Sequence, residues 1–308
     1  MNYLNKAPTA LVIPLFNESE SINKWLSPLI SDNKELSFIL IDDGSVDGTQ
    51  EDLGELSKRN NNVYIIRNKE NQGKIFSQSV GLKLAYEKSM NALLMDGDGQ
   101  HSSKDMQKIL NEGRGNNKLT IGIRGESYSR SLLARVGTYF LNLTLRLLGI
   151  EFDDRESEFI FLPTGSLSQI IESHHLGLLP INSIINQMNF EKVLVDIEIM
   201  PRAITQGNSD TRHNSSALLK KAMSYIFSEP WKLISKITKY SLLLAILSFT
   251  YGLYIGANSI LQGKFSGISS LIMVVLFFSV VIVFILIIIL GFIALEFERI
   301  NRSEKRKI

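Results

Sequence analysis

Two long apolar stretches in the C-terminal third of the sequence constrain the fold more than any other feature. Residues 240–260 and 268–295 contain no Asp, Glu, Lys or Arg. Because about 20 helical residues cross a hydrocarbon layer about 30 Å thick, both stretches are long enough to span a membrane. A buried helix of a soluble protein is the alternative, but residues 271–290 are apolar on every side of a helix, which favours contact with lipid. The sequence therefore predicts transmembrane helices at 240–261 and 268–295.

Basic residues flank this predicted hairpin on both sides. The connection at 262–267 is so short that the two helices must be antiparallel. Lysines cluster before the hairpin, and a basic tail follows it at 296–308. Since the cytoplasmic flanks of membrane helices carry an excess of Lys and Arg, we expect both termini and the N-terminal domain in the cytoplasm. The pattern is typical of a multi-pass protein of the cell inner membrane.

The segment at 216–239 mixes apolar side chains with lysines and contains Pro230. Because proline interrupts a helix, we predict two short amphipathic helices that lie on an anionic membrane surface. An ordinary helix packed on the domain core is the alternative for this segment.

The composition of the chain excludes several functions. Its 33 basic and 31 acidic residues balance too evenly to indicate a nucleic-acid partner. The absence of Cys excludes disulfides and thiolate metal sites.

The N-terminal part of the chain alternates between strand and helix patterns. Short apolar runs predict strands at 10–14, 37–41, 62–66 and 92–95. Amphipathic patterns predict helices at 18–30, 49–59 and 74–89, with another beginning near 106. Strands separated by helices imply right-handed crossovers and a parallel sheet. We therefore predict an α/β domain over residues 1–215.

Polar residues follow three of the predicted strands. Residues 96–101 contain Asp96 and Asp98 on either side of one glycine, a spacing that lets both carboxylates reach one hard cation. A solvated turn is the alternative for this motif taken alone. Residues 14–18 and 42–49 are also polar and acidic, and ligands of a parallel sheet gather at the carboxyl ends of its strands. Together the three strand ends predict a ligand site.

These motifs resemble the family 2 glycosyltransferases of the GT-A fold. Residues 13–20 match the pattern P-x-(Y/F)-N-E, and residues 41–49 match the long pattern D-D-G-S-x-D-G-T. Residues 71–74 match N-x-G-K, and residues 96–101 match D-x-D-x-Q-H. Within the family, the chain is similar to the polyprenyl-phosphate glycosyltransferases, namely dolichyl-phosphate mannose synthases and bactoprenol glucosyltransferases.

The resemblance implies a GT-A nucleotide-sugar-binding domain and a metal-dependent, inverting hexosyltransferase. The donor would be a UDP- or GDP-linked sugar, the acceptor undecaprenyl or dolichyl phosphate, and the cofactor Mg²⁺ or Mn²⁺. The product would serve cell-envelope glycans or glycolipids. Relatives with similar hairpins also imply a homo-oligomer such as a tetramer.

The resemblance also assigns roles to individual residues. The donor-binding residues would be Pro14, Phe16, Glu18, Asp42, Asp43, Lys74 and Asp96. The metal ligands would be Asp96, Asp98 and Gln100. The acceptor phosphate would meet Arg124, Arg130, Arg135 and Arg202, although a solvated surface arginine is the alternative for Arg130. The expected catalytic residues are Asp98, Arg124 and Arg135. A phosphate nucleophile is already anionic and needs no general base.

The chain departs from the family at two motifs and leaves two rival functions open. The family's closing pattern R-x-x-G-x-S-(K/R) is only partly visible, in Arg202 and residues 207–210. The family pattern S-G-F-(R/K) reads here Ser157, Glu158, Phe159 and Ile160, which puts a carboxylate where the family has glycine. A non-catalytic, membrane-anchored transferase that has lost its activity is one rival. A processive polysaccharide synthase is the other, but it would need a Q-x-x-R-W motif and more membrane helices.

Overall fold

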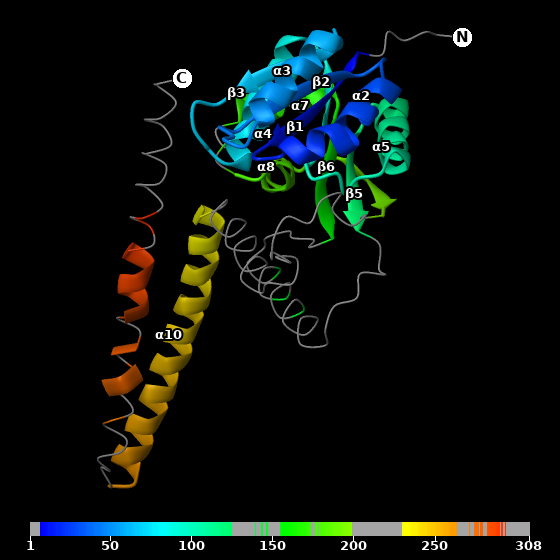
Figure 1. Cartoon of the computed structure of the whole chain (residues 1–308). Coiled ribbons are helices and arrows are strands. Elements are labelled where there is room, and N and C mark those ends of the chain that lie inside the picture. The colour runs from blue at the N-terminus through cyan, green and yellow to red at the C-terminus, as the bar shows by residue number, and fades with distance from the viewer. Residues whose placement is uncertain are drawn as a thin grey trace. The chain divides into compact units, whose positions relative to one another are not determined.

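The computed structural model describes residues 7–124, 155–173, 176–177, 179–198 and 230–263, with scattered positions in 139–146 and 271–293. The chain divides into two compact units (Figure 1). The first comprises residues 1–138 and 153–224, and the second comprises residues 139–152 and 225–308.

The first unit is built on a seven-stranded sheet with the order β3-β2-β1-β4-β6-β5-β7. The strands are β1 (Thr9–Leu15), β2 (Ser37–Asp42), β3 (Val63–Arg67), β4 (Asn91–Leu94), β5 (Leu119–Arg124), β6 (Glu156–Leu162) and β7 (Lys192–Ile197). Strands β1 to β4 are mutually parallel, and β5 is parallel to β7. Only β6 runs antiparallel to its neighbours β4 and β5. The mostly parallel sheet expected for a GT-A domain is confirmed.

Helices cover both faces of this sheet. They are α1 (Ser19–Ser21), a π-helical turn (Ile22–Leu26), α2 (Ser27–Asp32), α3 (Thr49–Arg59), α4 (Lys74–Glu87), α5 (Ser103–Asn116), α7 (Thr164–Glu172) and α8 (Ile181–Gln187). The first three follow one another without a gap over residues 19–32, where one helix was predicted at 18–30. The difference is the π-helical turn between α1 and α2. The helices predicted at 49–59 and 74–89 are confirmed to within two residues.

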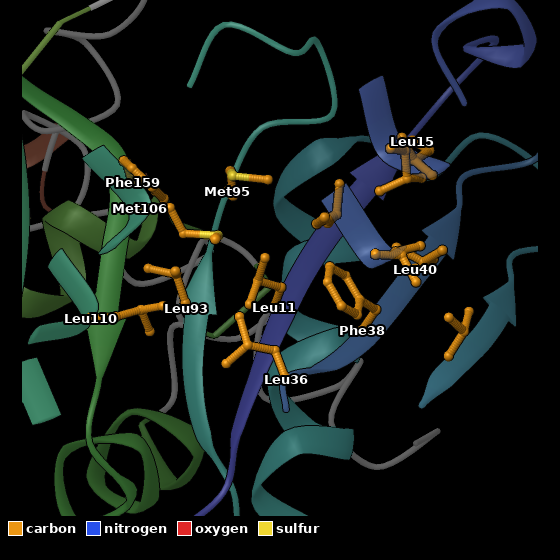
Figure 2. Close-up of a cluster of buried hydrophobic side chains, with 14 of the residues drawn as sticks. Leu11, Leu15, Leu36, Phe38, Leu40, Leu93, Met95, Met106, Leu110 and Phe159 are labelled. Carbon is orange, nitrogen blue, oxygen red and sulfur yellow. The ribbon is translucent and has the colours of Figure 1, made fainter. Parts of the chain in front are cut away.

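Alternating side chains of the central strands divide the core into two layers. On β1, Leu11, Ile13 and Leu15 pack with α2, α3 and α5, and part of this cluster is drawn in Figure 2. The intervening residues Ala10 and Val12 pack on the opposite face with α4, α7 and α8. Because successive strand residues point to opposite faces, a strand buried on both sides reads as an unbroken apolar run. The sequence of β1 has this pattern.

Helix α5 begins with a reciprocal pair of hydrogen bonds. The backbone N–H of Asp105 donates to Ser102 Oγ at 3.0 Å, and the Ser102 hydroxyl donates to Asp105 Oδ2 at 2.8 Å. The buried Asp105 carboxylate also accepts from Lys108 Nζ at 2.8 Å and from the backbone N–H of Glu198 at 3.2 Å. Burial alone would raise the pKa of Asp105, but these hydrogen bonds outweigh it and lower the pKa.

We expect Asp105→Ala to lower the free energy of unfolding by about 1–3 kcal/mol at pH 7, because it removes the acceptor of three partly buried hydrogen bonds. A carboxylate with a lowered folded-state pKa stabilises the fold above its unfolded pKa of 3.8, and this contribution is lost as the pH falls through the folded-state value. The deficit of the variant should therefore shrink between pH 7 and pH 3 in denaturant titrations. The exposed Asp32, changed in the same way, should show no comparable deficit. A deficit that is constant with pH would contradict this role of the ionised carboxylate.

The second unit contains one long helix among its described residues, α10 (Pro230–Leu261). Its segment Ile234–Leu261 is apolar and long enough to cross a membrane, with a mean hydropathy of 1.5. No other helix within the described residues meets this test of length and composition. Within the described residues the helix runs from Pro230, which is tolerated in a first helical turn, without a break into the apolar stretch. The part of the predicted amphipathic segment after Pro230 is thus continuous with the apolar helix, and its contact with a membrane surface stays a prediction.

Other predictions for this part of the chain lie mostly outside the described residues. These are the segment before Pro230, the second transmembrane helix at 268–295 and the basic tail at 296–308.

Candidate active site

The carboxyl ends of β1, β2 and β4 and the beginning of α4 line one pocket of about 280 Å³. Its lining residues are Pro14, Leu15, Phe16, Glu18, Asp43, Asn71, Gly73, Lys74, Asp96, Gly97 and Asp98. The pocket thus brings together residues from four separate segments of the sequence. With the exception of Asp42, every predicted donor-binding residue lies in its wall.

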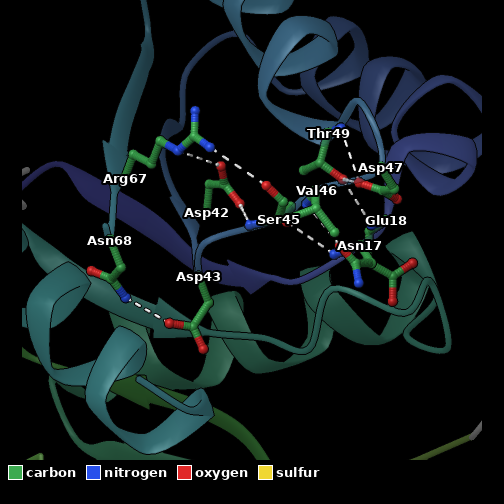
Figure 3. Close-up of polar contacts among 10 residues, drawn as sticks. All are labelled: Asn17, Glu18, Asp42, Asp43, Ser45, Val46, Asp47, Thr49, Arg67 and Asn68. Atoms are coloured by element: carbon green, nitrogen blue, oxygen red, sulfur yellow. Dashed lines mark hydrogen bonds and ion pairs between the residues drawn. The ribbon is translucent and has the colours of Figure 1, made fainter. Parts of the chain in front are cut away.

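The loop after β2 is fastened to the loop after β1 by hydrogen bonds (Figure 3). The backbone N–H of Asn17 donates to Ser45 Oγ at 2.9 Å, and the Asn17 side chain accepts from the N–H of Val46 at 3.0 Å. The N–H of Glu18 donates to Thr49 Oγ1 at 2.9 Å. These bonds explain why the two motifs at 14–18 and 42–49 occur together, since each shapes the other.

Asp42 stabilises this loop instead of facing the pocket. Its carboxylate accepts from the backbone N–H of Ser45 at 2.9 Å and lies 3.5 Å from Nε of Arg67. The side chain is buried and does not line the pocket. The structure therefore corrects the prediction of Asp42 as a donor-binding residue. Because Asp42 and Asp43 are consecutive, they point in different directions, and the pocket receives Asp43.

Asp43 lies in the pocket wall and holds the loop that precedes α4. Its Oδ1 accepts from Asn68 Nδ2 at 2.7 Å and from the N–H of Gln72 at 3.0 Å. Its Oδ2 accepts from the N–H of Gly73 at 2.9 Å. The next residue, Gly44, has φ +73°, and a Cβ there would lie 2.6 Å from the carbonyl carbon of Glu70. The close approach of these two loops therefore requires glycine.

The acidic turn after β4 places Asp96 and Asp98 in the pocket and leaves Gln100 outside its lining. The N–H of Gln100 donates to Asp98 Oδ1 at 3.1 Å, whereas Gln100 Nε2 is buried without a hydrogen-bond partner. A Cβ at Gly97 would lie 2.6 Å from the carbonyl oxygen of Pro14, so this position admits only glycine. Of the predicted metal ligands, only Asp96 and Asp98 therefore face the pocket.

The Lys74 ammonium lies between two carboxylates. Its Nζ is 2.6 Å from Asp96 Oδ1 and 2.8 Å from Glu158 Oε2. Burial alone would lower the pKa of Lys74, but the two carboxylates outweigh it and raise the pKa well above its ordinary value. Lys74 therefore stays protonated and paired with Asp96 and Glu158. Glu158 was not among the predicted donor-site residues, and its ion pair with Lys74 places it beside the pocket.

The family model described as glycosyl transferase family 2 matches residues 10–163, which is half of the chain and includes every residue of the pocket. The chain belongs to this family. Its members are glycosyltransferases.

Similar curated proteins come from archaea. An uncharacterized protein of Methanocaldococcus jannaschii is 37% identical over 102 residues, covering 32% of this chain and 44% of that protein. The UDP-N-acetylglucosamine–dolichyl-phosphate N-acetylglucosaminyltransferase of Methanococcus voltae is 32% identical over 157 residues, covering 45% of this chain and 62% of that protein. The chain thus spans less than two thirds of the length of these relatives.

Solved structures of similar proteins include glucosyl-3-phosphoglycerate synthase from Mycobacterium tuberculosis in complex with Mn²⁺, UDP and glucosyl-3-phosphoglycerate. That chain is 14% identical, with a TM-score of 0.48 over 75% of this chain and 80% of that chain. Mannosyl-3-phosphoglycerate synthase from Rubrobacter xylanophilus is 12% identical, with a TM-score of 0.47 over 72% of each chain.

Of the four arginines predicted to bind the acceptor phosphate, only Arg124 is among the described residues. Arg124 ends β5, and its Nε is buried without a hydrogen-bond partner. Arg130, Arg135 and Arg202 lie outside the described residues. An unpartnered guanidinium N–H is suited to an anionic ligand, and the phosphate-binding role of Arg124 stays a prediction.

His101, which ends the acidic turn, stacks on Phe159 with ring centroids 4.3 Å apart. Burial is the main cause that lowers the pKa of His101, and the positive charges of Lys74 and Arg124 act in the same direction against Asp96 and Asp98. A neutral imidazole packed on an aromatic ring helps to shape the turn.

Proposed function

We propose that this glycosyltransferase transfers a hexose from a UDP- or GDP-linked donor to a polyprenyl phosphate at the cytoplasmic face of a membrane. The observation that carries the proposal is the pocket that gathers Phe16, Asp43, Asp96 and Asp98 from the carboxyl ends of three parallel strands. Crevices at this edge of a parallel sheet are where such folds bind nucleotides.

The nucleoside would bind between Phe16 and Asp43. The Phe16 side chain is 43% exposed and offers an aromatic face to a base or ribose. Among the described residues, Asp43 Oδ2 receives one hydrogen bond, from the N–H of Gly73. A carboxylate oxygen can accept two, so Oδ2 can also accept from a base N–H or a ribose hydroxyl.

Asp96 and Asp98 would hold a Mg²⁺ or Mn²⁺ ion. No group of three or more His, Asp or Glu side chains in the described part of the chain is arranged to hold a metal by itself. Two carboxylates suit a hard cation that takes its remaining oxygen ligands from water and substrate phosphates. When bound, the cation would neutralise the negative charge on the leaving diphosphate. Gln100 would reach this site only by a change of its side-chain position.

The acceptor phosphate would bind at Arg124, together with Arg130, Arg135 and Arg202. Its anionic oxygen can attack the anomeric carbon directly, with inversion, which explains why the pocket needs no general base. Two observations support a lipid acceptor. The relative from Methanococcus voltae is named for a dolichyl-phosphate substrate, and α10 has the length and composition of a membrane span. Location in the inner membrane and assembly as a homo-oligomer, such as a tetramer, complete the proposal.

The proposal is tested with the full chain in membranes, Mn²⁺ or Mg²⁺, radiolabelled UDP- and GDP-sugars, and undecaprenyl or dolichyl phosphate. We expect one donor to give a labelled lipid that partitions into organic solvent, and EDTA to abolish its formation. Nucleotide binding without any product would instead indicate the non-catalytic transferase. A long, water-soluble labelled polymer would indicate a processive synthase.

A further inference from the structure

Asp96 and Glu158 face one another at the edge of the pocket. Strands β4 and β6 are antiparallel, with Leu94 opposite Ile160 as the last registered pair. Continuing this register by two residues places position 96 opposite position 158. Carboxylates directly opposite one another on neighbouring strands repel, so this arrangement needs a counter-charge.

Helix α4 supplies that counter-charge from its first turn. Lys74 contacts both carboxylates, at 2.6 Å and 2.8 Å, and Gln78 donates from Nε2 to the same Oε2 of Glu158 at 3.0 Å. Positions 74 and 78 are one helical turn apart and therefore lie on the same face of α4. Gln78 is buried, while the exposed fractions of the Lys74, Asp96 and Glu158 side chains are 44%, 31% and 27%. Glu158 is thus held at two points by one helix.

We propose that Glu158 is a positioning residue that shares Lys74 with Asp96 and keeps the ammonium off the donor diphosphate. Lys74 then acts as the counter-ion of two carboxylates, and the diphosphate is left to the cation at Asp96 and Asp98. To reach a phosphate, Lys74 would have to leave one carboxylate, and with the cation at Asp96 the carboxylate left without a positive partner would be that of Glu158. The catalytic part of this inference rests on the proposed function.

The decisive experiment is a double-mutant cycle with Lys74→Met, Glu158→Gln and the double variant, in the full chain. Glu158→Gln removes the charge and keeps the side-chain shape and an acceptor for Gln78. We expect Lys74→Met to lower kcat/KM about 100-fold, because Asp96 and Glu158 then repel. Adding Glu158→Gln to this variant should raise kcat/KM again by about 10-fold, because only one carboxylate then needs a positive partner. If Lys74 instead binds the diphosphate directly, the double variant will be no better than Lys74→Met, and the proposal is overturned.

Separate measurement of kcat and the donor KM adds a test that a purely structural role of Glu158 would not affect. Glu158→Gln alone should lower the donor KM about two- to fivefold with kcat nearly unchanged, because Lys74 gains freedom to approach the diphosphate. An unchanged or raised KM would contradict the proposal. The exposed ion pair of Arg59 with Glu55 is the matched control. The corresponding Arg59→Met and Glu55→Gln cycle should leave kinetics unchanged.

Failure of the inference can be distinguished from failure of the proposed function. Thermal unfolding of the four proteins without nucleotide should show the same rescue of Lys74→Met by Glu158→Gln. If the Tm changes of the two single variants simply add in the double variant, Lys74 is not a counter-ion shared by Asp96 and Glu158, whatever the activity. If the protein transfers sugar but Glu158→Gln does not rescue the kcat/KM of Lys74→Met, only the proposed role of Glu158 is overturned. A wild-type protein that binds neither UDP nor GDP overturns both proposals.

Discussion

Asp98→Ala is expected to lower the rate of sugar transfer about 1,000-fold while the protein stays folded. Asp98 lies in the pocket wall, and its carboxylate is one of the two proposed to hold the cation on the leaving diphosphate. Charge stabilisation by such a cation contributes several kcal/mol to the transition state, and about 4 kcal/mol corresponds to three orders of magnitude in rate. The measurement is the initial rate of lipid-linked product over a range of Mn²⁺ concentrations.

The variant should also require more Mn²⁺ for half-maximal rate, because one of its protein ligands is gone. Asp32→Ala removes an exposed carboxylate at the end of α2 and serves as the control with unchanged kinetics. A variant at Asp98 that retains more than a tenth of the wild-type rate would contradict the assignment of this residue to the metal.

Asp43→Ala is expected to abolish measurable nucleotide binding and to lower the free energy of unfolding by about 2–3 kcal/mol. The carboxylate accepts from Asn68, Gln72 and Gly73, so its removal takes an acceptor from the buried Asn68 amide and frees the loop before α4. The same change removes the acceptor proposed for the base or ribose. Isothermal titration with UDP and GDP, together with denaturant titration, measures both effects.

Asp42→Ala is the informative comparison, because Asp42 is equally buried and adjacent in sequence. It should cost a similar free energy of unfolding by releasing Ser45 and Arg67. At a temperature where both variants are folded, nucleotide affinity should fall much less for Asp42→Ala. Equal loss of affinity would mean that Asp43 acts only through the loop and does not contact the nucleotide.

The convergence of the three motifs could be predicted because it follows from strand direction alone. In a parallel sheet the carboxyl ends of β1, β2 and β4 lie at one edge, so Pro14, Asp43 and Asp96 had to be close. The sequence could not decide which of Asp42 and Asp43 faces the pocket. That choice depends on the turn at Ser45 and on Arg67, which comes from the next strand.

The role of Glu158 could not be predicted for a different reason. It depends on the antiparallel insertion of β6 between β4 and β5, a pairing of distant segments that no local pattern specifies. Because β6 runs opposite to its neighbours, its beginning lies at the edge where theirs end. The sequence showed the Glu158 carboxylate where the family has glycine, but only the strand register shows that it lies beside Lys74.

The contact of Gly97 with the Pro14 carbonyl has a consequence for the order of ligand binding. A Cβ at position 97 would lie 2.6 Å from the Pro14 carbonyl oxygen, so the acidic turn packs closely against the end of β1, next to the loop proposed to receive the nucleoside. A nucleotide that orders this loop would therefore also restrict the carboxylates of Asp96 and Asp98 and lower the entropy cost of binding a cation. By thermodynamic reciprocity, cation and nucleotide would raise each other's affinity by the same factor. Coupling of this kind would disfavour a cation without its donor and let the two ligands assemble the site together.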